Sequence, residues 1–354
     1  MRVHLMAALL FGAVATTGSA FPAPAKSLHC GDTITTDTVL TKNLVCAGTA
    51  LNLSTTGDHM VTIDLNGHRL KGNGTGTGIS VTWNYQAYPQ LGSLTVTNGT
   101  ITGFAAAMIG GSGRDFVLNT LTLTDLRLVA NNAWLPPSIR REVLVKNSSI
   151  IDSGFGGAYN SSGSLTAQNS LFLRSGINSE DESFNYLYNN TFIEAGFRAS
   201  AESDVIAINN IFRDCDTALT VNGTWSQAPT RVEDNKFIHC RIGVDLPQMS
   251  GPVSVQRNLF SKNTQAGMTF SVLAPHQVDI ADNTFAGNAG DGLTGSGEDP
   301  NTALPATVVR VTGNLAVRNA GHGINVINVT DGGANRARGN GSSPECLGVV
   351  CAKP

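Results

Sequence analysis

The feature that most constrains this chain is a short motif, Asn-x-Phe, that recurs at nearly regular steps. It occurs as Asn190-Thr191-Phe192, Asn210-Ile211-Phe212, Asn235-Lys236-Phe237, Asn258-Leu259-Phe260 and Asn283-Thr284-Phe285, with related copies at Asn147, Asn169 and Asn314. Successive asparagines lie 20 to 31 residues apart. This step matches one coil of a β-solenoid and is too short for a propeller blade. The flanking β-branched and aromatic residues alternate with period two, which favours strands over helices.

A second column of residues follows the first at nearly constant order. Each copy of the motif is followed by a small residue and then an apolar one: Gly154-Phe155, Gly176-Ile177, Gly196-Phe197, Ala218-Leu219, Gly243-Val244, Gly267-Met268, Gly292-Leu293 and Gly323-Ile324. The small residue permits a tight bend, and the apolar residue returns the chain to the core. The two columns predict an all-β parallel solenoid of about ten coils, stacked at about the strand spacing of 4.8 Å.

This register predicts the role of the repeated side chains. Each phenylalanine is expected to stack on the phenylalanine of the next coil, and each preceding asparagine to hydrogen-bond its neighbours above and below. The asparagines are therefore interpreted as scaffold, although they are the most conspicuous residues of the sequence.

The six cysteines indicate an oxidising compartment. Cys215 and Cys240 each follow their phenylalanine by three residues, so the register stacks them in adjacent coils within disulfide range. The shorter spacings predict two more bonds, Cys30–Cys46 and Cys346–Cys351, one near each end of the solenoid. Buried free thiols are the alternative.

The sequence divides into a leader, a solenoid and two caps. Residues 1–20 resemble a signal peptide, because the apolar run from Leu5 to Ala15 is too short to span a bilayer and ends near Gly18-Ser19-Ala20. We expect an N-terminal cap over 21–60, a parallel β-helix over 61–329 and a C-terminal cap over 330–354. No later stretch is long enough to cross a membrane. Since 23 Lys and Arg balance 26 Asp and Glu, a nucleic-acid partner is not expected.

An ionisable residue follows each aromatic or equivalent apolar position by two. The members of this column are Asp152, Arg174, Glu194, Asp214, His239 and Lys262. If the register holds, they form one exposed stripe with neighbours about 5 Å apart. The next coil has Gly287, where the stripe is expected to stop. Arg198 and Asp245, each just after a small–apolar pair, are further outward candidates.

We interpret the stripe as one side of a polysaccharide groove. Arg174 and Lys262 would neutralise acidic sugars, with Asp152, Arg198 and Asp245 as further substrate-binding residues. Glu194, Asp214 and His239 are the candidates for proton transfer, as the acid or base of a catalytic step. The alternative is a solvated face of ion pairs, each worth only about 0–1 kcal/mol.

No metal site or cofactor is predicted. The sequence has no zinc-type cluster of Cys and His. The acidic turn Glu180-Asp181-Glu182 is the one candidate for Ca²⁺, which takes several oxygen ligands, but three adjacent acids are more often simply exposed.

The coils resemble those of the right-handed parallel β-helix repeat in the pectate-lyase-like superfamily. The starts Cys30-Gly31-Asp32 and Asp64-Leu65-Asn66-Gly67 and the end Asn335-Arg336-Ala337-Arg338 are similar to those of its exported bacterial members. The resemblance covers nearly the whole mature chain. It implies the fold, but the superfamily includes lyases, hydrolases, epimerases and adhesins.

The signatures of particular enzymes in that superfamily are incomplete here. Gly321-His322-Gly323 resembles a hydrolase motif without its upstream aspartates or downstream Arg-x-Lys, and Asp299-Pro300 lacks the rest of an epimerase motif. We therefore expect a secreted, monomeric β-helix that binds a polysaccharide or cell-surface glycan and cleaves or remodels it. If it is an enzyme, lyase chemistry is favoured over hydrolase or epimerase chemistry. A non-catalytic adhesin, surface-binding or structural β-helix is the alternative.

Overall fold

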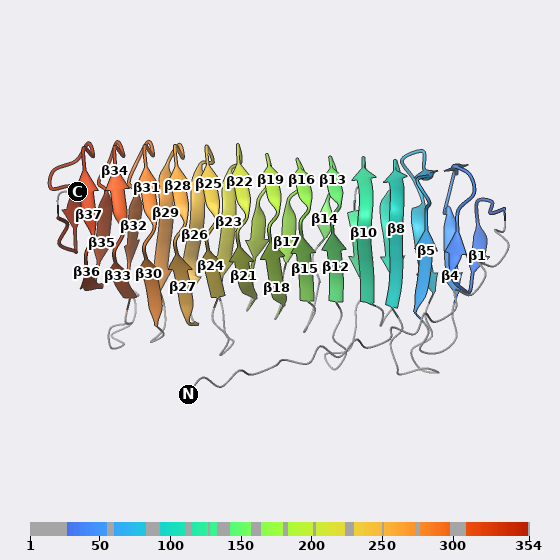
Figure 1. The fold of residues 1–354 in the computed structure, drawn as a ribbon, viewed down its shortest axis with the longest axis horizontal. Helices are drawn as coiled ribbons and strands as arrows, with labels where there is room; N and C mark the ends of the chain where they lie inside the picture. Colours follow the sequence, from blue (N-terminus) through green and yellow to red (C-terminus); the bar gives the residue numbers. More distant parts are fainter. Residues whose placement is uncertain are drawn as a thin grey trace, which may run out of the picture.

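The computed structural model describes residues 27–54, 60–82, 93–110, 115–126, 128–132, 142–156, 164–179, 183–200, 203–223, 230–249, 251–272, 277–297 and 309–352. These residues form short strands joined by turns and wound into one long stack, which Figure 1 shows from the side. Every strand pairing is parallel to the strand one coil away, such as β16 with β19. The predicted right-handed parallel β-helix is confirmed. The expected signal peptide and the acidic turn at 180–182 lie outside the described residues.

The coils build three parallel faces, which we call sheets I, II and III. Sheet I contains β2 (Thr38–Val39), β5 (Val61–Asp64), the first half of β8 (Ser93–Thr102) and of β10 (Asp115–Thr124), β12 (Glu142–Lys146), β15 (Ser164–Gln168), β18 (Phe184–Tyr188), β21 (Asp204–Ile208), β24 (Thr230–Glu233), β27 (Val253–Gln256), β30 (Val278–Ala281), β33 (Val309–Thr312) and β36 (Thr330–Gly333). Sheet II contains β3 (Leu44–Val45), β6 (Arg69–Lys71), the second halves of β8 and β10, β13 (Ser149–Ile151), β16 (Leu171–Leu173), β19 (Thr191–Ile193), β22 (Ile211–Arg213), β25 (Lys236–Ile238), β28 (Leu259–Ser261), β31 (Thr284–Ala286), β34 (Leu315–Val317) and β37 (Arg336–Arg338).

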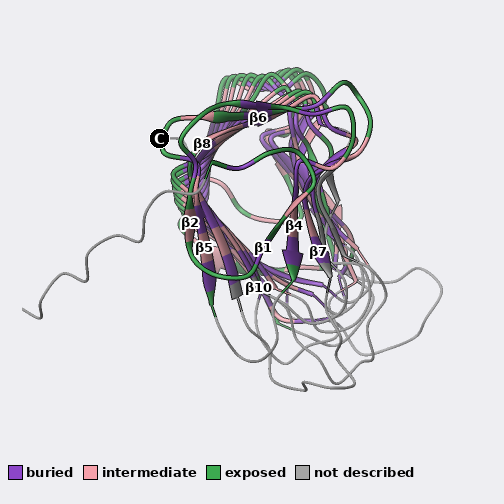
Figure 2. Cartoon of the chain, turned by 90° about the vertical axis from the view of Figure 1, so that its right-hand side faces the viewer, coloured by how far each residue is buried: buried purple, intermediate pink, exposed green. Residues whose placement is uncertain are grey.

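Sheet III runs in two stretches. The first contains β1 (Asp32–Ile34), β4 (Leu51–Ser54), β7 (Thr77–Thr82), β9 (Ala106–Gly110) and β11 (Leu128–Asn132). The second contains β14 (Phe155–Gly156), β17 (Ile177–Ser179), β20 (Phe197–Ala199), β23 (Thr217–Asn222), β26 (Ile242–Met249), β29 (Ala266–Val272), β32 (Leu293–Ser296), β35 (Ile324–Ile327) and β38 (Cys346–Leu347). In the end view of Figure 2 the three faces enclose the interior of the coil. No helix among the described residues is long and apolar enough to cross a membrane.

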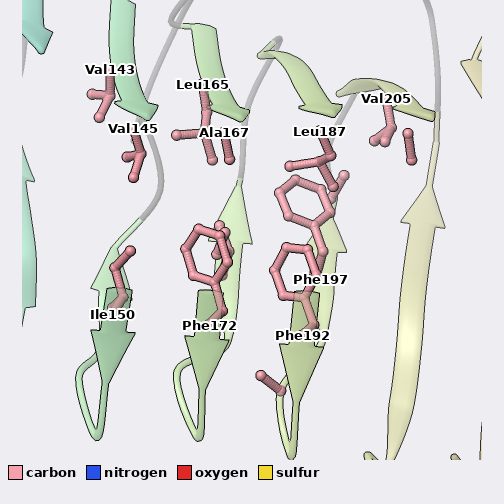
Figure 3. Packing of buried hydrophobic residues seen from close by; sticks show 14 of the residues in the cluster. Val143, Val145, Ile150, Leu165, Ala167, Phe172, Leu187, Phe192, Phe197 and Val205 are labelled. Carbon is pink, nitrogen blue, oxygen red and sulfur yellow. The ribbon is translucent and has the colours of Figure 1, made fainter. Parts of the chain in front are cut away.

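The phenylalanine column forms the centre of the core. The rings of Phe172, Phe192, Phe212, Phe237, Phe260 and Phe285 stack in order, with centroids 4.4–5.3 Å apart. All six are fully buried. Figure 3 shows Phe172 and Phe192 in equivalent places on neighbouring coils, beside aliphatic residues such as Leu165 and Leu187. A coil cannot bury these rings alone, so stacking supplies the core.

The asparagines of the five full Asn-x-Phe copies, together with Asn314, form a buried hydrogen-bonded ladder, as predicted, whereas the copies at Asn147 and Asn169 lie in an exposed ladder. The Nδ2 group of Asn235 donates to Oδ1 of Asn258 at 3.0 Å, and the backbone N–H of Asn235 donates to the same oxygen at 2.9 Å. Asn258 repeats both bonds to Asn283. This arrangement satisfies polar groups that would be costly to bury without partners.

The three predicted disulfides are present. Cys215 is bonded to Cys240 in the next coil with a Cα separation of 4.4 Å. Cys30–Cys46 and Cys346–Cys351 lie near the two ends. The Cys215–Cys240 bond occupies a second stacked column, which continues as Asn263, Asn288, Asn319 and Asn340.

Candidate functional site

The predicted ionisable stripe lies at the turn between sheets II and III, along the upper edge of the stack in Figure 1. Its members Asp152, Arg174, Glu194, Asp214, His239 and Lys262 all adopt left-handed backbone conformations, with φ between 47° and 58°. The backbone N–H of each residue donates to the carbonyl that precedes the next member, as Arg174 does to Ile193. Below, we call this set and its later equivalents the turn column.

The turn column does not stop at Gly287, contrary to the prediction from the sequence. Gly287, Arg318 and Gly339 occupy the same turn position with φ of 64°, 54° and 67°. Their backbone bonds continue the pattern, because Gly287 donates to Val317 and Arg318 to Arg338. Glycine takes this left-handed position at no steric cost, so it interrupts the side chains but not the column.

A change in turn length shapes the surface beside this column. Two residues separate Glu194 from Phe197, whereas four separate Asp214 from Leu219. Phe197 and Leu219 are nevertheless paired in sheet III, so the two extra residues must bulge outward. The short turns of three coils therefore lie beside the longer turns of the following coils.

A groove of about 830 Å³ lies at this step. Its short-turn side includes Gly154, Gly176 and Gly196, and its raised side includes Asp216, Thr217 and Arg241. The turn column contributes Arg174 and Glu194, and sheet III contributes Arg198, Asp245 and the polar residues Asn178, Thr220 and Asn222. The groove crosses five successive coils and is open along its length.

Arg174 is already neutralised on one side. Its Nε and Nη2 atoms lie 2.5 and 2.7 Å from the two carboxylate oxygens of Asp152. This bidentate hydrogen bonding lowers the pKa of Asp152 and raises the pKa of Arg174. Glu194, on the other side, raises the pKa of Arg174 further through its charge. Arg174 thus forms an ion pair with Asp152 and lies in the field of a second carboxylate of the turn column, Glu194.

Arg198 and Asp245 belong to a second outward column, on sheet III. Register pairs Arg198 with Thr220 and Thr220 with Asp245, so they lie two coils apart on the same line. Asp245 accepts a hydrogen bond from Thr269 Oγ1 at 2.5 Å. Within the described ranges no carboxylate forms an ion pair with Arg198. Arg198 is therefore the groove cation that is most available to a ligand.

Four predicted residues lie beyond the groove lining: Asp152, Asp214, His239 and Lys262. His239 Nδ1 is 3.7 Å from Asp214 Oδ1, and Arg213 Nη1 is 3.4 Å from Asp214 Oδ2, so these side chains pair with one another. Lys262 lines a separate cleft farther along the column. The structure thus brings together Arg174, Glu194, Arg198 and Asp245 in the groove, whereas the proton-transfer candidates His239 and Asp214 pair with each other outside its lining.

Two charged groove residues were not predicted. Arg241 Nε lies 2.5 Å from Asp216 Oδ1, and Arg241 also bonds Thr217 Oγ1 at 3.1 Å and Gln265 Oε1. Hydrogen bonding to Asp216 raises the pKa of Arg241. Both residues follow the cysteine of their coil, inside the lengthened turns. The signal in the sequence was the increase in spacing between the motif and the small–apolar pair.

The sequence matches the family model described as "Periplasmic copper-binding protein (NosD)" over residues 131–289 and 168–341, which together span more than half of the chain. The chain belongs to this family. No curated protein matches the sequence.

Several solved structures share a similar arrangement at low identity. The periplasmic alginate epimerase AlgG is 12% identical with a TM-score of 0.49, covering 80% of this chain and 77% of its own. The A-module of the Azotobacter vinelandii mannuronan C-5 epimerase AlgE6 is 12% identical (TM-score 0.30; 92% and 91%), and the catalytic unit of a GH87 α-1,3-glucanase from Streptomyces thermodiastaticus is 13% identical (TM-score 0.36; 92% and 70%). With TM-scores below 0.5, these likenesses say nothing about the activity of this NosD-family chain.

The described residues of this family member do not fit a copper site. Copper prefers imidazole, thiolate and thioether ligands. All six cysteines are in disulfides, and of the described methionines Met108, Met249 and Met268 are buried in the core, while Met60 is exposed. No group of three or more His, Cys, Asp or Glu side chains able to hold a metal occurs in the part of the chain that the structure describes.

Proposed function

We propose that this protein binds an acidic polysaccharide in the groove between the turn column and sheet III. The observation that carries the proposal is the shape and charge of that groove: it is open and crosses five coils, and cations and carboxylates alternate along it. An extended polymer can lie along such a surface, whereas a compact ligand would occupy only part of it.

Arg198 is the proposed anchor for a sugar carboxylate. Arg174 and Arg241 form ion pairs with Asp152 and Asp216, which partly neutralise their charges. Arg198 has no such partner among the described residues, and its guanidinium can bind a carboxylate with two parallel hydrogen bonds. Asn178 and Thr220, next to it on the same outward column, would bond sugar hydroxyl groups.

Glu194 is the proposed proton-transfer residue if the polymer is cleaved. It lies in the groove, in the coil of Arg198, on the turn column. In a lyase, Glu194 would accept the proton from the carbon next to the sugar carboxylate, while Arg198 stabilises the charge that develops there. The electron pair left on that carbon would form the new C=C bond as the glycosidic C–O bond on the adjacent carbon breaks, and the departing oxygen would take a proton from water. Asp214 and His239 do not line the groove, so Glu194 is favoured over them for this step.

A binding or adhesive protein without catalysis is the second candidate. The observation that favours it is the pairing of the predicted catalytic residues with one another, His239 to Asp214, away from the groove. In this case the groove holds the glycan and releases no product.

Export to an oxidising compartment is part of the proposal. Three observations support it: residues 1–20 resemble a signal peptide, the chain has three disulfides, and the matched family is described as periplasmic. The mature protein would then meet its polysaccharide outside the cytoplasm.

The test is a titration with polyuronates, with and without Ca²⁺, that follows both binding and the appearance of unsaturated and reducing ends. Arg198→Gln should weaken binding about fivefold, the loss expected for one exposed ion pair. Lys236→Gln is the matched control, since it removes an exposed cation of sheet II outside the groove. If Arg198→Gln binds as well as Lys236→Gln, the groove is not the binding site.

The same titration separates the two candidate functions. A catalytic protein forms product, and Glu194→Gln abolishes the product while the polymer still binds. A binding protein forms no product on any substrate, and Glu194→Gln changes nothing but affinity. Absence of binding to every polyuronate would overturn the proposal.

A further inference from the structure

The turn column has a second cleft, about 490 Å³ in volume, toward the C-terminal end of the stack. Three cations line it, Lys262, Arg318 and Arg338. Its floor contains Ser261, Ala286 and Val317, which are register partners on successive strands of sheet II. No acidic residue is among its lining residues.

Glycine at alternate positions of the turn column opens this cleft. Lys262, Gly287 and Arg318 occupy the turn position of three successive coils. At about 4.8 Å per coil, the backbones of Lys262 and Arg318 are roughly 10 Å apart. A Cβ atom at Gly287 would have only Lys262 Cγ within 4 Å, at 3.9 Å, so the space that a side chain would fill here is open. The result is a gap between two cations that is wide enough for a ligand group.

The charges in this cleft are not neutralised by described carboxylates. Arg174, Arg231, Arg241 and Arg257 elsewhere in the stack are all in ion pairs. No described carboxylate forms an ion pair with the three cations of the cleft. Glu345, which bonds the backbone N–H of Gly339, is not a lining residue and also accepts from Asn340 Nδ2. Three cations thus share one concave surface on a chain whose formal net charge is −3.

We propose that this cleft is an oxyanion site. It would bind a carboxylate, sulfate or phosphate group between Lys262 and Arg318, with Arg338 as the third donor. Such groups occur on acidic glycans and as free inorganic ions. The site is distinct from the groove at Arg198 and does not depend on the function proposed for that groove.

The sharpest test changes only the charge in the gap. Gly287→Asp places a carboxylate beside Lys262, and Gly287→Asn places a neutral side chain of the same size there. Both residues tolerate the left-handed backbone, and aspartate already occupies this turn position at Asp152 and Asp214. Gly287→Asp should bind oxyanions at least about tenfold more weakly than Gly287→Asn, because like charges repel across the site.

The ligands are a uronic-acid trisaccharide, a sulfated trisaccharide, inorganic sulfate and inorganic phosphate, each titrated at constant ionic strength. The readout is the backbone amide NMR signal of Gly339 in every protein, and that of Gly287 in the proteins that retain this glycine; both residues lie in the cleft. Tighter binding of a trisaccharide than of the inorganic ions identifies a glycan as the source of the oxyanion. Tighter binding of an inorganic ion identifies a free ion, and both results support the site.

The proposal is overturned if these signals do not move with any ligand, or if the Asp and Asn variants bind equally. A double variant, Lys262→Gln/Arg318→Gln, gives an independent measurement and should lose binding by about tenfold, as expected for two exposed charge pairs. Arg198→Gln should leave the ligand-induced shifts of the Gly287 and Gly339 signals unchanged. Failure of the groove proposal is therefore seen separately from failure of this one.

Discussion

The strands of sheet II lie between two stacked columns of residues, one buried and one exposed. The column before each strand repeats asparagine at Asn235, Asn258 and Asn283, and it is buried with its polar atoms partnered. The turn column after each strand changes residue in almost every coil and remains exposed. In the buried column each asparagine accepts the hydrogen bonds that the asparagine of the preceding coil donates. In the exposed column water can hydrogen-bond the side chains, so the residue type is free to vary and the side chains can contact a ligand.

The largest expected effect comes from breaking the buried column. In Asn258→Leu, the backbone N–H and Nδ2 group of Asn235 lose their acceptor, and the carbonyl of Val232 loses its donor. Each of these three buried groups loses a hydrogen bond, although Asn235 Nδ2 keeps its bond to the carbonyl of Ala207, and the free energy of unfolding should fall by about 4 kcal/mol. Denaturant unfolding measures this loss.

Asn209→Gly is the matched control for that variant. Asn209 is an exposed asparagine with φ of 57° that bonds Asn189 Oδ1 at 2.8 Å, and glycine accepts the same backbone. Its loss should be less than about 1 kcal/mol, because water replaces the bond. Equal losses in the two variants would show that burial does not distinguish the columns.

The disulfide of the second buried column gives the next effect. Cys215→Ser/Cys240→Ser opens a link across 25 residues and should cost about 3 kcal/mol. Cys215→Asn/Cys240→Asn should recover about 1 kcal/mol of that loss, because amides at these places extend the ladder that begins at Asn263. Thermal and denaturant unfolding of both variants, without reductant, would show the difference. If the Asn variant is no more stable than the Ser variant, the column does not depend on the residue type.

The smallest effect is electrostatic and lies in the turn column. Arg174 lowers the pKa of Asp152 from its ordinary value of 3.8, so the pair adds stability above that pH and loses it as the pH falls through the lowered pKa. In Arg174→Gln the pKa of Asp152 should rise toward 3.8. A carboxyl NMR titration measures it. An unchanged pKa in the variant would mean that the ion pair does not form in solution.

The fold was predictable because the buried residues repeat. Each Phe and Asn must meet its copy, so the sequence step fixes the register, and the register placed Cys215 on Cys240 before the structure was known. The same logic found the turn column. It failed at Gly287, where the missing side chain was interpreted as the end of the column although the backbone continues to Arg318.

The groove was not predictable, because it depends on what does not repeat. Asp216 and Arg241 lie in extra turn residues that bulge outward without disturbing the paired core positions. The repeat spacing of the core residues does not reveal such insertions, since the pairing of Leu219 with Val244 is preserved around them. Periodicity also gave no means to separate Glu194, which lines the groove, from Asp214, which does not. The catalytic roles suggested for Glu194, Asp214 and His239 stay predictions, and we now favour Glu194.

The amide ladders have a direction, and each has a last member. In the two buried ladders each Nδ2 donates to the Oδ1 of the next asparagine toward the C-terminus, as Asn258 does to Asn283 and Asn263 to Asn288, so a final acceptor is needed. Asn340 donates from its backbone N–H and Nδ2 to the carboxylate of Glu345, and Asn335 donates from Nδ2 to that of Asp331. An ionised carboxylate accepts hydrogen bonds but cannot donate one, so it ends the ladder, whereas another asparagine would extend it. Asp331 and Glu345 both lie in residues 330–354. This supports our proposal that this segment caps the stack, as residues 21–60 would at the other end. The acidic residue at the end of each ladder prevents a further asparagine from extending it.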